Sequence, residues 1–328
     1  MRQDKHSVTS LRRMAALALT AALSAGALFT ATSVRAETID FPIYSRTIFF
    51  LPLWIADKQG FFKAENIDIA YSSATQDEVA AQLKAGKLGI NFLGPETAYA
   101  DPGGALRVVA GNAGKLPHFI IAQPQIKTLA QLRGANFGVI SEHEGTTHVI
   151  PEIAKAAGLA AGDYKMSAVG SAPTRWTLLK AGKIDAGLQP FPLSYEAEDA
   201  GFTNLGWTGD YEPDWQFTAI VVNDDWAKRH KNTVAGFLRA MRRGTEFMAS
   251  NREQAAAIAV TELKTRPDYA KRAIDDAIRL HILDATLNVN EAGMKRVFEV
   301  SPKAPGVTAY DASKYVDISY LRESQKAR

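Results

Sequence analysis

The stretch that decides the fold occurs twice: Leu83-Lys84-Ala85-Gly86-Lys87-Leu88 recurs as Leu179-Lys180-Ala181-Gly182-Lys183-Ile184. Upstream of these copies, Ser73-Ala74 matches Ser171-Ala172, and each pair stands between a predicted strand and a predicted helix. Downstream, each copy runs through a strand into a loop that contains proline. One six-residue match can arise by chance, but three matches at a nearly constant offset predict two similar α/β lobes.

Short apolar segments alternate with helical patterns over the first two thirds of the chain, which favours an α/β fold with a largely parallel sheet. Thr75 with Glu78 forms a predicted capping box, Pro52 is predicted to open a helix, and Asp224 is predicted to cap another. The strands are predicted at 38–44, 67–71, 88–93, 106–110, 118–122, 136–140, 165–169, 184–188 and 217–222. Beyond them the pattern turns helical, at 233–249, 255–261, 269–282, 291–300 and 312–321.

The N-terminus has the pattern of a secretory signal peptide. Arg2, Lys5, Arg12 and Arg13 precede an uncharged, alanine- and leucine-rich run over 14–34. We expect cleavage after Ala36 and a periplasmic location. A transmembrane helix is the alternative, and the paired arginines leave the export route open between the general and the twin-arginine pathway.

Composition excludes several functions. The 328 residues include no cysteine, so disulfides, thiolate metal sites and cysteine nucleophiles are ruled out. Of 38 basic and 35 acidic residues, positions 1–36 hold five and one, which leaves 33 and 34 and a net charge of −1. We therefore expect no nucleic-acid or anionic-membrane partner. No two-histidine metal motif is present, and we expect neither a metal nor a cofactor.

A turn in the second half is a candidate anion cradle. Residues 138–140 read as a strand, Gly145 allows a turn, and Thr146 or Thr147 is predicted to cap the next helix. Free N–H groups at such a helix start, with two hydroxyls, attract anions. An ordinary capped turn is the alternative. Glu142 and Glu144 would repel an anion, so we expect them to point away from it.

Ligands of open α/β sheets bind at the carboxyl ends of strands. Arg46 and Arg175 are the cations best placed for a carboxylate or sulfonate, with salt bridges as the alternative. Trp54 is a better candidate for the core than for an aromatic wall, and His118 and His148 are better structural residues than metal ligands. The predicted ligand-binding residues are Arg46, Thr47, Phe49, Ser73, Gly94, Glu96, Thr97, His118, Ser141, Gly145, Thr146, Thr147, Thr174, Arg175, Gln189, Phe191 and Trp215.

Several segments resemble one family in order and spacing over about residues 38–265. Leu51-Pro52-Leu53-Trp54-Ile55-Ala56-Asp57-Lys58-Gln59-Gly60-Phe61-Phe62, followed by Glu65-Asn66-Ile67-Asp68-Ile69, is similar to the first helix and second strand of periplasmic substrate-binding proteins of ABC transporters. The segments 132–139, 145–147 and 178–186 resemble the same family, in its nitrate/sulfonate/taurine branch.

The resemblance implies a two-lobed type II fold with two crossover strands, near 118–122 and 217–222. Lobe one would comprise 37–122 and 217–328, with the helical C-terminal part packed on it, and lobe two 123–216. It further implies a monomer that traps a small organic anion, a sulfonate or carboxylate with an aromatic body among the options, between its lobes. The closed form would dock on the permease and ATPase subunits of an importer.

Two other readings remain open on the same residues. One is a periplasmic protein that senses the ligand for a membrane receptor. The other is a secreted enzyme on the same fold, although no Gly-x-Ser-x-Gly elbow and no metal-binding histidine motif are present. Turnover of a candidate ligand would separate an enzyme from a binding protein.

Overall fold

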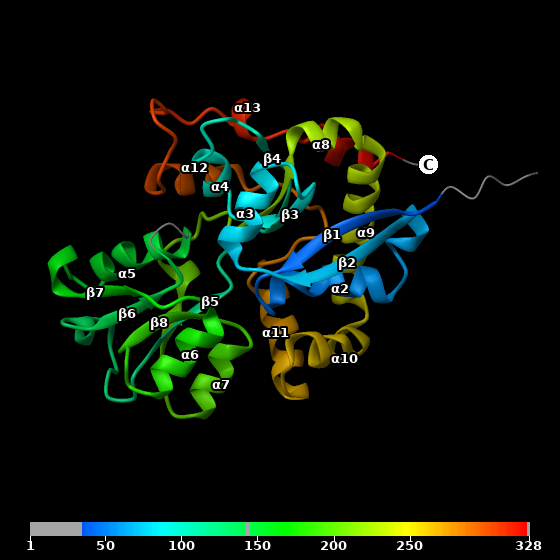
Figure 1. Ribbon diagram of the computed structural model, residues 1–328. Coiled ribbons are helices and arrows are strands. Elements are labelled where there is room, and N and C mark those ends of the chain that lie inside the picture. Colours follow the sequence, from blue (N-terminus) through cyan, green and yellow to red (C-terminus); the bar gives the residue numbers. More distant parts are fainter. Residues whose placement is uncertain (1–34, 142–144, 327–328) are drawn as a thin grey trace, which may run out of the picture. The chain divides into compact units, whose positions relative to one another are not determined.

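The computed structural model describes residues 35–141 and 145–326 (Figure 1). The predicted signal sequence up to residue 34 and the orientation of Glu142 and Glu144 therefore lie outside the described residues.

One sheet has five strands in the order β7-β6-β8-β5-β9. Its strands are β5 (His118–Ala122), β6 (Asn136–Val139), β7 (Lys165–Ala168), β8 (Ala186–Pro190) and β9 (Thr203–Trp207). β6 runs parallel to β7 and β8, whereas β5 is antiparallel to β8 and β9. The expectation of a largely parallel sheet holds here, with β5 as the single reversed strand.

The remaining strands form two smaller sheets. β1 (Glu37–Ile43) pairs in parallel with β2 (Ile67–Ser73). β10 (Thr218–Asn223) lies between β3 (Ile90–Leu93) and β4 (Leu106–Ala113) and is antiparallel to both. The chain thus enters the five-stranded sheet at β5 and returns to the three-stranded sheet at β10. These reversed strands are the two segments expected to cross over.

Helices surround the strands (Figure 1). The helices are α2 (Leu51–Lys58), α3 (Gln76–Lys84), α4 (Glu96–Tyr99), α5 (Ile150–Ala156), α6 (Ala172–Lys180), α7 (Leu193–Asp199), α8 (Asp224–Arg229), α9 (Lys231–Ser250), α10 (Arg252–Leu263), α11 (Pro267–Arg279), α12 (Glu291–Val300), α13 (Ala312–Tyr315) and α14 (Ser319–Ser324). Short 3-10 helices add η1 (Ile48–Phe50), η2 (Lys63–Glu65), η3 (Leu129–Leu132), η4 (Gly145–Val149), η5 (Ala161–Asp163) and η6 (Thr208–Asp210).

Local signals set several helix ends correctly. The predicted capping box is present: Thr75 Oγ1 accepts from Glu78 N at 3.2 Å, and the Glu78 carboxylate accepts from Thr75 N at 2.7 Å. Asp224, however, is the first residue of α8 and not its cap. Asn223 caps the helix, since its Oδ1 accepts from Trp226 N at 3.0 Å while its Nδ2 donates to Leu83 O at 3.1 Å.

The C-terminal helix predicted at 312–321 is broken in two. Val316 forms a bridge with Val108 of β4, and Asp317 N donates to Val108 O at 2.9 Å. This pairing with the sheet edge replaces the helical hydrogen bonds between α13 and α14. Three short elements were not predicted, namely α4, α7 and β9. They carry few residues and little hydrophobic periodicity.

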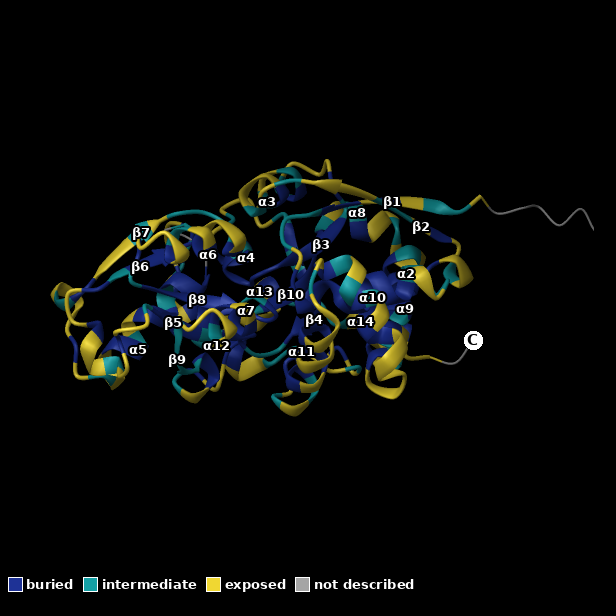
Figure 2. Ribbon diagram, turned by 90° about the horizontal axis from the view of Figure 1, so that it is seen from below, coloured by how far each residue is buried: buried dark blue, intermediate teal, exposed yellow. Residues whose placement is uncertain are grey.

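Buried residues gather along the strands, and exposed ones lie on the outer faces of the helices (Figure 2). One core packs α2, α9, α10 and α11 against β1 and β3. Here α9 crosses α2 at Gly244, where a Cβ would come 2.3 Å from Pro52 O. A second core runs from β4 and β10 to β5, β6 and α5. A third, smaller one lies between the five-stranded sheet and the helices α6 and α7.

Candidate functional site

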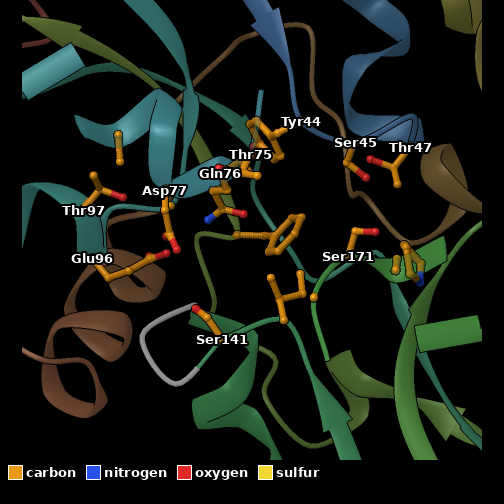
Figure 3. A pocket seen from close by; sticks show the side chains of 18 of the residues that line it. Tyr44, Ser45, Thr47, Thr75, Gln76, Asp77, Glu96, Thr97, Ser141 and Ser171 are labelled. Carbon is orange, nitrogen blue, oxygen red and sulfur yellow. The ribbon is translucent and has the colours of Figure 1, made fainter. Parts of the chain in front are cut away.

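A cavity of about 650 Å³ is lined by residues from both the three-stranded and the five-stranded sheet regions (Figure 3). Loops and helix starts that follow β1, β2, β3, β6 and β7 contribute to it, together with residues at β5, β8 and β10. This is the arrangement expected from binding at strand ends. A volume of this size fits a small organic molecule.

Arg175, on α6, is one of the residues that line the cavity. Its side chain is 1% exposed, and Nη2 donates a hydrogen bond to Leu188 O. The alkyl part lies over Gly138 and Gly187, which face each other on neighbouring strands. A Cβ on Gly187 would come 2.8 Å from Arg175 Cδ, so the glycine makes room for the arginine. The sheet therefore fixes a cation beside the cavity.

Two further polar groups on the lining are nearly inaccessible. Thr47 is 2% exposed and His118 is 3% exposed. Thr47 Oγ1 and His118 Nδ1 have no hydrogen-bond partner within the part of the chain that the structure describes. Because buried polar atoms in native proteins are nearly always paired, a bound molecule or water is the expected partner of both.

His118 is held in its neutral form. Burial, and then the positive charge of Arg175, lowers the pKa of His118 well below its usual value of 6.5. The ring packs edge-on against Phe217, with ring centroids 4.9 Å apart. A neutral imidazole beside a guanidinium can donate or accept one hydrogen bond without adding charge.

The lining also carries carboxylates. Glu96, at the start of α4, is 7% exposed, and Asp77 lies in the first turn of α3. Figure 3 shows the side chains of both residues directed toward the same part of the cavity. Lys84, at the end of α3, lines the cavity too. Among the described residues, the charged groups of the lining are thus two cations and two anions, with a neutral histidine.

Eight of the seventeen predicted ligand-binding residues line this cavity: Thr47, Phe49, Gly94, Glu96, Thr97, His118, Ser141 and Arg175. Arg46 and Ser73 line a neighbouring cavity of about 580 Å³ instead. There Arg46 donates to Glu262 O at 2.8 Å and stands over the Trp54 ring at 5.9 Å. Arg46 Nη1 also lies 3.4 Å from Glu262 Oε2, which is the salt-bridge alternative for this residue.

The threonines of the proposed anion cradle do not line the cavity. Thr146 and Thr147 are buried inside η4, and Thr147 Oγ1 donates to Ser141 O at 2.7 Å. The prediction that they cap the next helix is wrong, because α5 begins after Val149. Pro151 stands in the first turn of α5. The 3-10 turn takes up the residues expected to begin that helix.

Five other predicted residues lie off the lining. Gln189, Phe191 and Trp215 are fully buried in the protein interior, and Phe191 packs on Phe119 with ring centroids 5.8 Å apart. Thr174 is exposed and lies 3.1 Å from Ser171 through the two hydroxyls. Gly145 lies against Glu96. A Cβ added at Gly145 would come 3.3 Å from the Glu96 carboxylate, so the glycine leaves room for that side chain.

Several lining residues were not predicted as ligand contacts: Tyr44, Ser45, Gln76, Asp77, Lys84, Ser171, Ala172, Phe217 and Pro302. Ser45 directly precedes the predicted Arg46, and Ala172 lies three residues before the predicted Arg175. Asp77 and Lys84 face the cavity because of the way α3 docks, for which the sequence carries no local signal.

None of the helices in the described residues is long and apolar enough to cross a membrane. The same residues include no group of three or more histidine or acidic side chains that could hold a metal ion.

The fold is that of type II periplasmic binding proteins, as the resemblance implied. The ligand-binding component of an ABC-type import system from Staphylococcus aureus superposes with a TM-score of 0.71, at 14% identity over 89% of this chain and 100% of that one. The periplasmic aliphatic sulphonate binding protein SsuA from Escherichia coli gives 0.64, at 16% identity over 80% and 86%. A variant of the desulfurization enzyme DszB, in complex with biphenyl-2-sulfinic acid, gives 0.64, at 12% identity over 88% and 99%.

The chain belongs to the NMT1/THI5-like family, whose model matches residues 48–255. A protein of Brucella abortus (strain 2308), named as a candidate binding protein, is 24% identical over 214 residues. That match spans 64% of this chain and 66% of the relative, just under two thirds of its length. Both binding proteins and an enzyme have this fold. The residues of the site must therefore indicate to which of these two classes of protein the chain belongs.

Proposed function

We propose that this chain is an extracytoplasmic solute-binding protein that captures a small organic acid and delivers it to an ABC importer. The observation that carries the proposal is the 650 Å³ cavity with the buried Arg175 in its lining. A guanidinium binds a carboxylate or sulfonate through parallel hydrogen bonds. Thr47 Oγ1 supplies a further donor, and its lack of a partner among the described residues supports this role.

In this proposal the acid group lies near Arg175, Thr47 and His118. Arg46 and the Thr146-Thr147 pair, expected to hold it, lie off the lining of this cavity. Phe49 and Phe217 supply the apolar wall for the body of the ligand, because both line the cavity. An aromatic or an aliphatic body fits such a wall.

We further propose that the segments 37–122 with 217–328 and 123–216 act as two lobes that close on the ligand. The cavity takes lining residues from both segments, so a ligand that contacts both favours the closed state. The location would be periplasmic, and the permease and ATPase would act on the loaded form. The S. aureus and E. coli proteins of the same fold support this placement.

The test is a thermal-shift screen of the purified mature chain against sulfonates, aliphatic carboxylates, aromatic carboxylates, amines and neutral sugars. A ligand at one hundred times its Kd stabilises the folded state by about 2.7 kcal/mol. For a chain of this size that raises the Tm by roughly 4–5 °C. Stabilisation by amines or sugars alone would refute the proposal.

Two arginine variants locate the acid group. Arg175→Met removes the charge and keeps an apolar chain of similar length, and we expect it to abolish the shift caused by acids. Arg133→Met is the matched control, since Arg133 is an exposed arginine outside the lining. Calorimetry of the free variants shows whether each remains folded. An unchanged acid-induced shift in Arg175→Met would place the acid elsewhere.

An enzyme on the same fold is the alternative, because the desulfurization enzyme DszB has a similar fold. Incubation of the protein with each stabilising compound, followed by mass spectrometry, separates the classes. A binding protein returns the compound unchanged, whereas an enzyme yields product.

A further inference from the structure

We propose that the ligand is elongated, with its acid group in the first cavity and an uncharged, hydroxyl-bearing part in the neighbouring cavity of about 580 Å³. The inference rests on the proposed function, in which the acid group lies near Arg175. It names the ligand class more closely: an acid that carries a sugar or polyol group, such as a glycoside of a hydroxy acid.

The two cavities share part of their lining. Tyr44, Ser45 and Ser171 line both of them. Tyr44 and Ser45 follow β1, whereas Ser171 precedes α6, so this common boundary takes residues from each proposed lobe. Figure 3 shows Ser45 and Ser171 on the side of the first cavity that lies away from Glu96. A ligand too long for the first cavity would extend past these residues into the second.

The charged side chains of the second cavity already have partners. The carboxylate of Glu262 lies 2.9 Å from Lys58 Nζ and 3.4 Å from Arg46 Nη1. The Asp57 carboxylate accepts a hydrogen bond from the side chain of Tyr71. A second charged group on the ligand would have to displace one of these partners, which costs part of what it gains. The lining therefore favours an uncharged occupant.

Serine hydroxyls make up most of the remaining polar lining of the second cavity. Ser72 and Ser73 stand at the end of β2 and are exposed, and Ser45 and Ser171 stand at the boundary with the first cavity. Trp54 adds apolar surface to the same lining. A hydroxyl both donates and accepts hydrogen bonds, so these groups pair with the hydroxyls of a sugar without a charge on either side.

The volumes also favour a long ligand. Pockets that bury most of the surface of a drug-sized ligand measure roughly 300–1,000 Å³. The first cavity lies within this range at about 650 Å³, and the second adds about 580 Å³. A short acid leaves the second cavity to water, whereas an elongated acid makes contacts in both cavities.

The experiment compares short acids with their glucosides by isothermal titration calorimetry on the mature protein. One pair is 4-hydroxybenzoate and 4-(β-D-glucopyranosyloxy)benzoate, and the other is 6-hydroxyhexanoate and 6-(β-D-glucopyranosyloxy)hexanoate. Within each pair the acid group is the same, and the glucoside adds an uncharged sugar. We expect the glucoside of at least one pair to bind at least tenfold more tightly than the short acid, because a few additional hydrogen bonds provide a gain of that size.

Ser72→Tyr places a bulky side chain at the second cavity, and Ser72 does not belong to the lining of the first. The residue is exposed on β2, and tyrosine is a residue that strands accommodate well. We expect the affinity for the glucosides to fall at least tenfold, to that of the short acids. Ser250→Tyr, exposed at the end of α9 and outside both linings, is the control. The melting temperature of each free variant reports its folding.

A charged sugar tests the pairing of charges in the second cavity. The glucuronide 4-(β-D-glucopyranuronosyloxy)benzoate has a carboxylate where the glucoside has a hydroxymethyl group, and we expect it to bind about tenfold less tightly. Glu262→Gln releases Arg46 and Lys58 from their shared carboxylate. It should raise the affinity for the glucuronide about tenfold relative to that for the glucoside. Glu253→Gln, on the same helix α10, is the control.

The outcomes separate the two proposals. If the short acids bind and Arg175→Met weakens them, but the glucosides bind no more tightly or Ser72→Tyr leaves them unaffected, this inference is wrong while the acid-binding function stands. A glucuronide that binds the parent protein as tightly as the glucoside also overturns it. If phenyl β-D-glucoside, which has no acid group, binds as tightly as the acid-bearing glucosides, the acid-binding function fails. Failure of all these compounds to bind counts against both proposals.

Discussion

Gly187→Ala tests how the five-stranded sheet positions the cation of the cavity. Gly187 lies on β8 between β6 and β5, where its backbone pairs with Gly138 and Ile121. A Cβ added there would come 2.8 Å from Arg175 Cδ, 3.2 Å from Cγ and 3.3 Å from Nε. Ordinary contacts begin at about 3.4 Å, so Cδ must retreat by about 0.6 Å. A central strand cannot move by that much, and the arginine must.

The displacement has two measurable consequences. Forcing one methyl group into a filled interior costs about 1–3 kcal/mol, which for a chain of this size lowers the Tm by roughly 2–5 °C. The guanidinium also loses its alignment with the cavity, and a charge-assisted hydrogen bond is worth about 1.5–3 kcal/mol. We therefore expect the affinity for an acid ligand to fall about ten- to hundredfold.

Calorimetry measures both effects, by scanning for the Tm and by titration for the affinity. Gly162→Ala is the matched control, because a Cβ at Gly162 meets no heavy atom within 4 Å and the residue has no positive φ. It should leave both quantities within error. If Gly187→Ala binds the acid as tightly as the parent protein, Arg175 does not hold the acid group in the geometry described.

Three further predictions concern stability, each measured by urea unfolding. Tyr195→Phe removes the hydroxyl that donates to Asp276 Oδ2 at 2.7 Å, and it should lower the free energy of unfolding by about 1–3 kcal/mol. An unchanged free energy of unfolding would mean that this hydrogen bond contributes nothing to stability. Asn223→Ala removes the cap of α8 and should lower the free energy of unfolding by about 1–3 kcal/mol. Asn223→Asp keeps the acceptor for Trp226 N and should lower it less. Equal losses in the two variants would contradict the capping role. Because burial and Arg175 lower the pKa of His118, the unfolded chain takes up a proton below pH 6.5 that the folded chain refuses. As the pH is lowered below 6.5, the free energy of unfolding should therefore decrease, by up to about 1.4 kcal/mol per pH unit for this group. A His118→Gln variant that keeps the full slope between pH 7.5 and 5.5 would show that His118 is not its source.

Much of the architecture could be read from local patterns. The repeated stretch ends α3 and α6 in the same way, with Gly86 and Gly182 at φ of 68° and 64°, a conformation that glycine adopts without strain. The strand at 118–122 and the helix at 291–300 were predicted with their observed bounds. These elements depend on residues close in sequence, so periodicity and turn chemistry suffice to place them.

The site was predicted only in part, and the reason differs between residues. Arg175 was selected because it follows a strand, and it does line the cavity. Thr146 and Thr147 were selected by the same rule and are buried in η4. The rule gives the end of the sheet at which a residue lies, but not which way its side chain points after packing.

The chain's own residues, taken locally, thus determine the alternation of strands and helices, the repeated turn that ends α3 and α6, and the loops from which a site can be built. Tertiary packing determines which loop residues become the lining. Arg175 reaches the cavity because Gly138 and Gly187 meet on adjacent strands, and Glu96 approaches Gly145 from a different sheet region. Charge balance at the site depends on these long-range contacts, and no local pattern encodes them.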